Sequence, residues 1–203
     1  MTVRTEKKLL MRRVDLANSE VDQDALIKDA CSDREAFARL YRMHYERVFR
    51  YCSRRLFNRH AAEDVTSTVF FRVMRTISTF EGNSNDFRNW LYRISTNAVN
   101  DHLKTTKRRA DAIINAALEH DRRRAFTEEP DNELQKKVLA VKQALLGLKP
   151  KYQTVITLRF FEKMKLIEIA EILGKNQTTI RSQLARALSK MRKELRTTSR
   201  LEP

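Results

Sequence analysis

The stretch LIEIAEILGKNQTTIRSQLARALSKMRKEL, residues 166–195, decides the fold class of its part of the chain. Apolar residues recur at helical spacing before Gly174 and again after it. Glycine commonly ends a helix, because it adopts the left-handed backbone conformation without steric cost. A helix, a glycine-containing turn and a basic second helix form the pattern of a helix-turn-helix. The inward positions of the second helix are Ile180, Leu184, Ala187, Leu188, Met191 and Leu195.

The outer face of this last helix predicts contact with nucleic acid. Its polar positions are Arg181, Ser182, Gln183, Arg186, Lys190, Arg192, Lys193 and Arg196, opposed only by Glu194. Arginine and glutamine near the start of such a helix can read base edges in the major groove, whereas later basic residues mainly neutralise phosphates. A merely solvated basic helix is the alternative. The glycine turn and the apolar helix before it make that alternative the weaker one.

Composition agrees with a basic helical protein. The 203 residues contain 41 Lys and Arg against 26 Asp and Glu, a formal net charge of +15, so a polyanionic partner is expected. Nucleic acid is the leading candidate and an anionic membrane surface the second. Three glycines and three prolines are too few for a β-sandwich or barrel, and no glycine-rich loop could bind a dinucleotide.

Helical periodicity also runs through the first half of the chain. Ser32 and Glu35 predict a capping box before one amphipathic helix, and a second helix follows Asn58, with Met74 widening its apolar stripe. Asp86 is the expected N-cap of a third helix. The apolar faces of the three helices include Phe37, Leu40, Tyr41, Tyr45, Val48, Cys52, Val65, Val69, Phe70, Val73, Ile77, Phe87, Trp90, Leu91, Ile94 and Ala98.

We therefore predict an all-α fold of two small helical domains joined by a flexible linker, the second domain ending in the helix-turn-helix. The expected divisions are a leader at 1–24, a first domain at 25–104, a linker with a helical middle at 105–130, a second domain at 131–196 and a tail at 197–203.

Cysteine and histidine usage predicts a reduced, cytoplasmic protein without metal or other cofactor. Cys31 and Cys52 are too few for a disulfide framework or a four-ligand zinc site, and the four histidines lie in unrelated segments. No signal-peptide or membrane-spanning pattern is present. The sequence also lacks a nucleophile motif and a metal-binding carboxylate set, so we do not expect an enzyme.

The third helix of the first domain carries a polar stripe and is preceded by an aromatic loop. Arg93, Asn97, Asn100 and Lys104 recur at spacings of four, three and four, opposite the apolar face. Aromatic residues interleaved with polar ones around residues 80–92 could stack on unpaired bases. Packing is the alternative, and we assign Phe87 and Trp90 mainly to the core and Phe80 to the more open position.

The order of three segments resembles a bacterial RNA polymerase sigma factor of the extracytoplasmic-function (ECF) group, which has only the second and fourth conserved sigma regions. The resemblance covers residues 25–104 and 131–196. AEDVTSTVFFRVM (62–74) resembles the helix that docks on the polymerase clamp. FRNWLYRISTNAVNDHLKTTKRR (87–109) resembles the segment that melts and reads the minus-ten element, and residues 148–195 are similar to the domain that binds the minus-thirty-five element. The fold and function it implies are those of a sigma factor directing promoter-specific initiation.

The resemblance also implies which residues make contacts. Polymerase contacts would come from Glu63, Asp64, Ser67, Thr68 and Phe71. Minus-ten contacts would come from Phe80, Asn83, Ser84, Asn85, Asp86, Arg93, Asn97, Asn100 and Lys104, with a flipped base held by the loop. Minus-thirty-five contacts would come from Thr178, Thr179, Arg181, Ser182, Gln183, Ala185, Arg186 and Lys190. The implied partners are core RNA polymerase, at its clamp and flap, and promoter DNA, and an anti-sigma factor is left as an open further partner.

The chain departs from the family pattern at a few positions. Ser67 and Thr68 stand where the family commonly has glutamine and glutamate, and the loop between Phe80 and Phe87 is one residue longer than usual. Two other functions remain alternatives. A dimeric helix-turn-helix regulator would leave the aromatic loop and the Asn97 stripe without a role, and a recombinase or nuclease would need catalytic residues that are not present.

Overall fold

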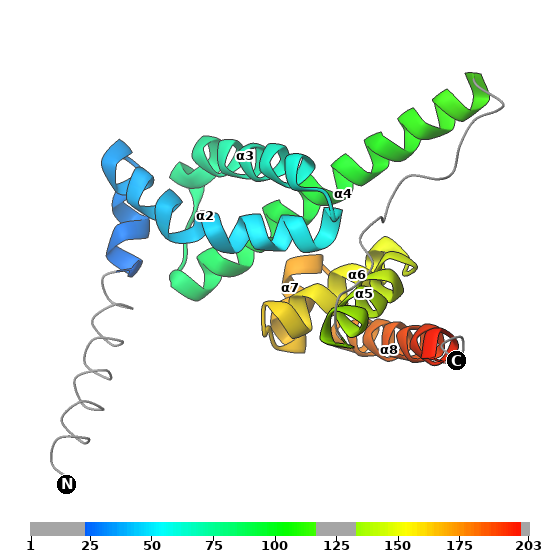
Figure 1. The fold of residues 1–203 in the computed structure, drawn as a ribbon. Helices are drawn as coiled ribbons and strands as arrows, with labels where there is room; N and C mark the ends of the chain where they lie inside the picture. The colour runs from blue at the N-terminus through cyan, green and yellow to red at the C-terminus, as the bar shows by residue number, and fades with distance from the viewer. Residues whose placement is uncertain (1–22, 117–132, 200–203) are drawn as a thin grey trace, which may run out of the picture. The chain divides into compact units, whose positions relative to one another are not determined.

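The computed structural model describes residues 23–116 and 133–199, and every regular element in those two ranges is helical (Figure 1). The all-α prediction is confirmed for them. The predicted leader up to residue 22, and residues 117–132 and 200–203, lie outside the described residues. The structure divides into two compact units. The first unit contains the chain up to Ser53 and the segment Asn58–Ala98. The second unit contains the short segment Arg54–Phe57 and the chain from Val99 onward.

Five helical elements make up the first part of the chain. They are a short helix at 23–29, α2 (Arg34–Leu56), α3 (Arg59–Thr76), the 3-10 turn η1 (Ile77–Thr79) and α4 (Ser84–Ala116). Five follow: α5 (Glu133–Leu146), α6 (Pro150–Ile156), the π-helical turn η2 (Thr157–Phe161), α7 (Leu166–Leu173) and α8 (Gln177–Ser199).

The helix starts differ in detail from the sequence predictions. Asp33, not Ser32, caps α2, because its two carboxylate oxygens accept the N–H groups of Glu35 and Ala36 at 3.0 and 3.1 Å. Asn83, not Asp86, caps α4: its Oδ1 accepts the N–H of Asn85 at 2.8 Å and of Asp86 at 3.1 Å. Asp86 occupies the third helical position and accepts the N–H of Asn83 at 3.1 Å, so the two residues form a reciprocal capping box.

The core of the first unit uses most positions of the predicted apolar faces, but Tyr41, which was expected to face inward, is 37% exposed. Its most deeply buried side chains include Ile27, Leu40, Val48, Tyr51, Val69, Phe87 and Leu91. The hydroxyls of Tyr51 and Thr96 lie 2.7 Å apart and satisfy each other inside this core. Met74 does not widen the buried stripe, since its side chain is 53% exposed. It lies one residue past buried Val73, about 100° further around the helix.

The helix α4 is longer than the sequence reading predicted. It continues without a break past Lys104, where we expected the linker to begin, to Ala116. Residues 105–116 contain no glycine or proline, and alanine, lysine and arginine favour a helix even where an apolar repeat fades. Residues 105–116 of the predicted linker are therefore the continuation of the third helix.

The buried side chain of His44 should make the stability of the first unit depend on pH. Its ring is buried against Phe87, with ring centroids 5.3 Å apart, and burial lowers its pKa to about 4, with a smaller contribution from the charge of Arg47. The unfolded chain takes up a proton at this position near pH 6.5, before the folded chain does. We expect the free energy of unfolding to fall by on the order of 3 kcal/mol as the pH drops from 6.5 to 4.

Urea unfolding of the wild type and of His44→Gln across this pH range checks the expectation. Contributions of the carboxylates are common to both proteins, so the difference between the two curves isolates the histidine. Parallel curves would show that His44 titrates alike in the folded and unfolded states.

The helices of the second unit form a compact core beneath α8. Leu145, Leu148, Tyr152, Ile156 and Ala187 are buried together, and Leu184, Leu188 and Met191 pack against them. The predicted inward face of α8 is thereby confirmed. No helix among the described residues has both the length and the apolarity needed to cross a bilayer.

Gly174 makes the turn of the helix-turn-helix. Its φ of 59° and ψ of 42° are left-handed, the conformation that glycine adopts at lowest cost. The N–H of Lys175 donates to the carbonyl of Ala170 at 2.9 Å, and the N–H of Gly174 donates to that of Glu171 at 3.2 Å. This pair of bonds is a Schellman motif, which satisfies the last carbonyls of α7 and redirects the chain into α8.

Candidate nucleic-acid interface

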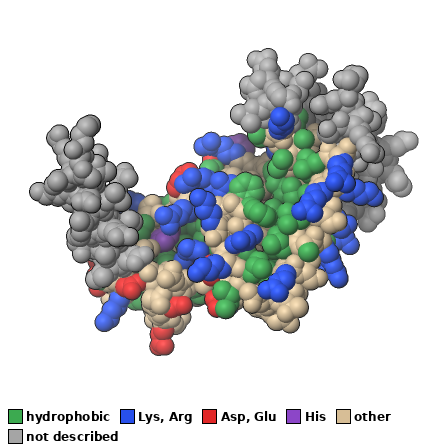
Figure 2. Space-filling view, turned by 90° about the horizontal axis from the view of Figure 1, so that it is seen from below, with side chains coloured by type: hydrophobic (Ala, Val, Ile, Leu, Met, Phe, Trp, Pro, Cys, Tyr) green, Lys and Arg blue, Asp and Glu red, His purple; other side chains and the backbone are tan. Residues whose placement is uncertain are grey.

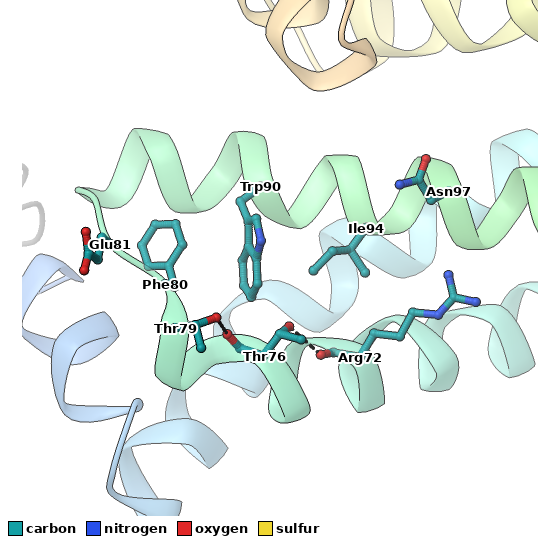
Figure 3. A pocket seen from close by; sticks show the side chains of 8 residues that line it. All are labelled: Arg72, Thr76, Thr79, Phe80, Glu81, Trp90, Ile94 and Asn97. Atoms are coloured by element: carbon teal, nitrogen blue, oxygen red, sulfur yellow. Dashed lines mark hydrogen bonds between the residues drawn. The ribbon is translucent and has the colours of Figure 1, made fainter.

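A groove of about 710 Å³ opens between α3 with η1 on one side and α4 on the other (Figure 3). Its lining residues are Arg72, Thr76, Thr79, Phe80, Glu81, Trp90, Ile94 and Asn97. Two of the predicted minus-ten residues, Phe80 and Asn97, thus meet in one site although they lie 17 positions apart in the sequence. The groove also brings in residues that the sequence analysis did not assign to it, above all Arg72 and Trp90.

Phe80 and Trp90 form an aromatic wall in the groove. Their ring centroids are 5.2 Å apart at an interplanar angle of 39°, and Figure 3 shows Trp90 reaching from α4 toward α3, between Phe80 and Ile94. Phe87 supports both rings from the core at centroid distances of 5.5 and 5.6 Å and is only 1% exposed. The assignment of Phe87 to packing is confirmed. Trp90, however, is half-buried, and it both packs on Phe87 and lines the groove.

The loop before α4 requires glycine at position 82. The φ of Gly82 is 145°, and a Cβ atom there would lie 2.8 Å from the Cβ of Asp86 and 3.2 Å from Cζ of Phe80. The first contact is closer than a Cβ atom makes and the second is tight, and side-chain-bearing residues rarely adopt this φ, so glycine allows the loop to fold against the aromatic wall. Asn83 and Asp86 are engaged in the capping box, and the N–H of Ser84 donates to Asp24 at 2.6 Å. These hydrogen bonds fix the loop, and none of the predicted residues 83–86 lines the groove.

Polar groups occupy the groove on either side of the aromatic wall. Thr76 donates its hydroxyl to the carbonyl of Arg72 at 2.7 Å, and Thr79 donates to that of Thr76 at 2.8 Å. Both hydroxyl oxygens keep acceptor capacity. Arg72 and Asn97 lie on opposite sides of the groove beyond Ile94, and Glu81 lies near Phe80 (Figure 3). The groove therefore offers both donors and acceptors beside an aromatic surface.

The remaining residues of the predicted α4 stripe differ in exposure. Arg93 and Lys104 are exposed, as expected for groups that meet a polyanion. Asn100 is half-buried, and its Oδ1 accepts a hydrogen bond from Nη2 of Arg55 at 3.4 Å. Asn100 thus supports the buried guanidinium of Arg55, in addition to any role at the surface.

Most of the predicted DNA-contacting side chains on the outer face of α8 are exposed to solvent. Thr178, Arg181, Ser182, Ala185, Arg186 and Lys190 are exposed. Thr179 and Gln183 are half-buried at the margin of this face, and Oε1 of Gln183 is shielded from solvent without a hydrogen-bond partner in the structure. Asn176 starts the helix, since its Oδ1 accepts the N–H of Thr179 at 2.7 Å. Basic side chains far outnumber acidic ones on the molecular face drawn in Figure 2.

The outer face of α3 combines a carboxylate with apolar surface. Asp64, Ser67, Thr68 and Phe71 are exposed and Glu63 is half-buried, in an ion pair with Arg59 at 2.9 Å. The hydroxyls of Ser67 and Thr68 donate to carbonyls one turn earlier in the same helix, each at 3.0 Å. On the same helix, Phe71 and Met74 expose 55% and 53% of their surface. Such a mixed face on a rigid helix suits a protein partner.

Two conserved regions match this arrangement of groove and helix-turn-helix. Sigma-70 region 2 matches residues 40–109, and sigma-70 region 4 matches residues 139–191. The chain therefore belongs to the sigma-70 family of RNA polymerase sigma factors, and the relatives described below place it in the ECF group. It is a sigma factor of transcription initiation with a DNA-binding region 4, as the resemblance implied. Among the described residues, no group of three His, Cys, Asp or Glu side chains could hold a metal ion.

Individual relatives agree with this assignment. The chain is 33% identical over 173 residues to the ECF RNA polymerase sigma factor BldN of Streptomyces coelicolor, a match that spans 84% of this chain and 62% of the relative. It is 31% identical to the ECF sigma factor SigW of Bacillus subtilis, across 81% of this chain and 91% of the relative. A chain in the structure of CnrH in complex with the cytosolic domain of CnrY has a similar fold, with a TM-score of 0.63 at 20% identity, covering 86% and 97% of the two chains.

Proposed function

We propose that this sigma factor binds core RNA polymerase through the outer face of α3, takes the minus-ten element as a melted single strand in the groove, and reads the minus-thirty-five element as duplex through α8. The aromatic wall of the groove carries the proposal. Bases inside a duplex have both faces covered by their neighbours, so only an unpaired base can stack on Phe80 or Trp90.

The exposed face of α8 supports the duplex half of the proposal. The major groove of B-DNA admits one α-helix, and arginine bonds in bidentate fashion to the O6 and N7 atoms of guanine. Arg181 and Arg186 are exposed in the N-terminal half of α8, and Lys190, Arg192 and Lys193 follow at positions suited to phosphates. Two modules of modest affinity joined in one chain would then bind one promoter tightly.

Run-off transcription with core polymerase on a genomic promoter library tests the proposal. We expect initiation at defined start sites only when this protein is added, and an alignment of the start sites reveals both promoter elements. Tight binding of the purified protein alone to symmetric duplex sites, without initiation, would instead support a dimeric regulator.

Asn97→Ala should impair open-complex formation more than polymerase binding. The side chain of Asn97 is exposed at the end of the groove and lies on α4, away from the outer face of α3. Permanganate reactivity of unpaired thymines measures opening, and co-migration with core polymerase measures binding. Asp64→Asn is the matched control with the opposite expected pattern, and equal loss of both activities in Asn97→Ala would contradict the assigned role.

A further inference from the structure

The segment at residues 24–31 makes hydrogen bonds to both ends of the loop beside the groove. We call this segment the N-terminal brace; it contains the last six residues of the short helix at 23–29 and the start of the turn that follows. We infer that the brace holds the loop at residues 80–83 in the conformation that receives an unpaired base, with Asp24 as a positioning residue. The inference rests on the proposed function of the groove, because it gives the brace a role at that same site.

The first contact of the brace lies where the loop enters α4. The Oδ1 atom of Asp24 accepts the N–H of Ser84 at 2.6 Å, across 60 positions of the sequence. Ser84 is the first residue of α4, and the first N–H groups of a helix have no carbonyl partner within that helix. Asn83 accepts the next two N–H groups, at 2.8 and 3.1 Å. Asp24 therefore completes the cap of α4 from another helix, and its negative charge lies at the positive end of the helix dipole.

The second contact of the brace lies at the other end of the loop. The thiol of Cys31 donates to the carbonyl of Ile77 at 3.2 Å. Ile77 is the first residue of η1, which ends directly before Phe80. The brace itself is anchored by packing, since Ile27 is only 2% exposed. One rigid segment thus fixes the backbone on both sides of the loop.

The loop needs such support because its own sequence holds it weakly. Gly82 has no side chain, and its φ of 145° is open to glycine but to few other residues. The ring of Phe80 nevertheless stands 5.2 Å from that of Trp90, as one wall of the groove. If the loop had to be ordered during binding, the lost conformational entropy would reduce the affinity for a base. We expect the brace to raise the affinity by preorganising the loop and not by touching nucleic acid.

The charge of Asp24 makes this inference testable by the sign of an effect. A carboxylate repels the phosphates of nucleic acid, so its removal should by itself strengthen binding of a polyanion. A positioning role predicts the opposite result, because the N–H of Ser84 loses its acceptor and the loop is freed at one end. Weaker binding after removal of a negative charge therefore cannot come from bulk electrostatics.

Fluorescence anisotropy of a labelled single-stranded minus-ten oligonucleotide, measured with the full-length protein, provides the first test. We expect Asp24→Ala to weaken binding by roughly 3- to 10-fold, the effect of losing one charge-assisted hydrogen bond. Asp24→Asn keeps an acceptor oxygen and should restore most of the affinity. Asp29→Ala is the matched control, because it removes an exposed carboxylate from the same short helix, about 140° further around it. We expect this control to bind as tightly as the wild type or slightly more tightly.

A second measurement follows the aromatic wall without nucleic acid. Trp90 is the only tryptophan of the chain, so its fluorescence reports on the wall directly. We expect acrylamide to quench Trp90 more strongly in Asp24→Ala than in the wild type, and equally in Asp29→Ala and the wild type. Urea unfolding of each variant identifies conditions in which all of them are folded, so that a loss of global stability does not enter the comparison.

The two measurements separate this inference from the proposed function. If Phe80→Ala/Trp90→Ala binds the oligonucleotide as tightly as the wild type, the proposed groove fails, and quenching alone decides whether Asp24 positions the wall. An affinity of Asp24→Ala equal to or above that of Asp29→Ala would overturn the inference, since Asp24 would then act only as a negative charge. Weaker binding with unchanged quenching of Trp90 would also overturn it, because Asp24 would then act by a route other than the wall.

Discussion

The double variant Arg181→Ala/Arg186→Ala should lose most of the discrimination that the sigma factor shows for its minus-thirty-five element. Both guanidinium groups are exposed on α8 within the three turns that follow Asn176, where a recognition helix meets base edges. A bidentate contact between arginine and guanine discriminates by about 1–3 kcal/mol. Loss of two such contacts should lower affinity for the preferred duplex by on the order of 100-fold, while affinity for unrelated duplex changes far less.

The measurement is the ratio of affinities for the preferred and a scrambled upstream duplex at one salt concentration, with each variant. Arg192→Ala is the matched control, because it removes the same kind of exposed side chain from the same helix, about 16 Å beyond Arg181 and about 9 Å beyond Arg186. We expect it to weaken both duplexes alike and to reduce the salt slope by about 1. A double variant that keeps the wild-type ratio would remove Arg181 and Arg186 from base recognition.

Helical periodicity predicted most of the core because burial follows the repeat directly. Ile180, Ala187, Leu40 and Val69 are all buried at positions where the 3.6-residue pattern placed them. Helix starts were harder to predict. Several Ser, Asp and Asn residues stand together before α2 and α4, and any of them can cap a helix. Only the three-dimensional path of the chain selects Asp33 and Asn83.

The groove was only partly predictable, for a related reason. Periodicity separates inward from outward positions, and Asn97 was recognised because it lies opposite the apolar stripe. Trp90 lies on the apolar stripe, and the spacing of apolar residues is the same for a fully buried side chain as for one at the rim of a groove. The sequence therefore did not show that Trp90 lines the groove. Arg72 belongs to another helix, and only the packing of α3 against α4 brings it opposite Asn97. An aromatic residue beside a loop that contains glycine, such as Phe80, was the one local signal of an open site.

The length of α4 shows that the loss of an apolar stripe does not reliably predict the end of a helix. The apolar stripe fades after Leu103 and residues 104–108 are exposed, yet the helix continues to Ala116. Helix propensity favours a helix over residues 105–116, and a search for buried faces does not detect propensity. Residues 105–116 were therefore assigned from the sequence to the linker.

Replacing both rings of the aromatic wall, in Phe80→Ala/Trp90→Ala, should abolish most binding to the melted minus-ten strand. Stacking of a base on an aromatic side chain contributes about 1–3 kcal/mol, and the two rings lie close enough, at 5.2 Å, to form one platform. We expect the affinity for a single-stranded minus-ten oligonucleotide to fall by on the order of 30-fold or more. Fluorescence anisotropy of the labelled oligonucleotide measures this directly with the full-length protein and without polymerase.

Two further variants distinguish stacking from packing in this experiment. Phe71→Ala removes an aromatic ring that is 55% exposed and lines no part of the groove, so it should leave oligonucleotide binding unchanged. Phe80→Leu keeps an apolar side chain against Phe87 but offers no ring to a base, so it should preserve the unfolding free energy more closely than alanine does while still weakening the single-strand complex. If Phe80→Leu binds the oligonucleotide as tightly as the wild type, the ring supports the loop by packing and the base is held elsewhere.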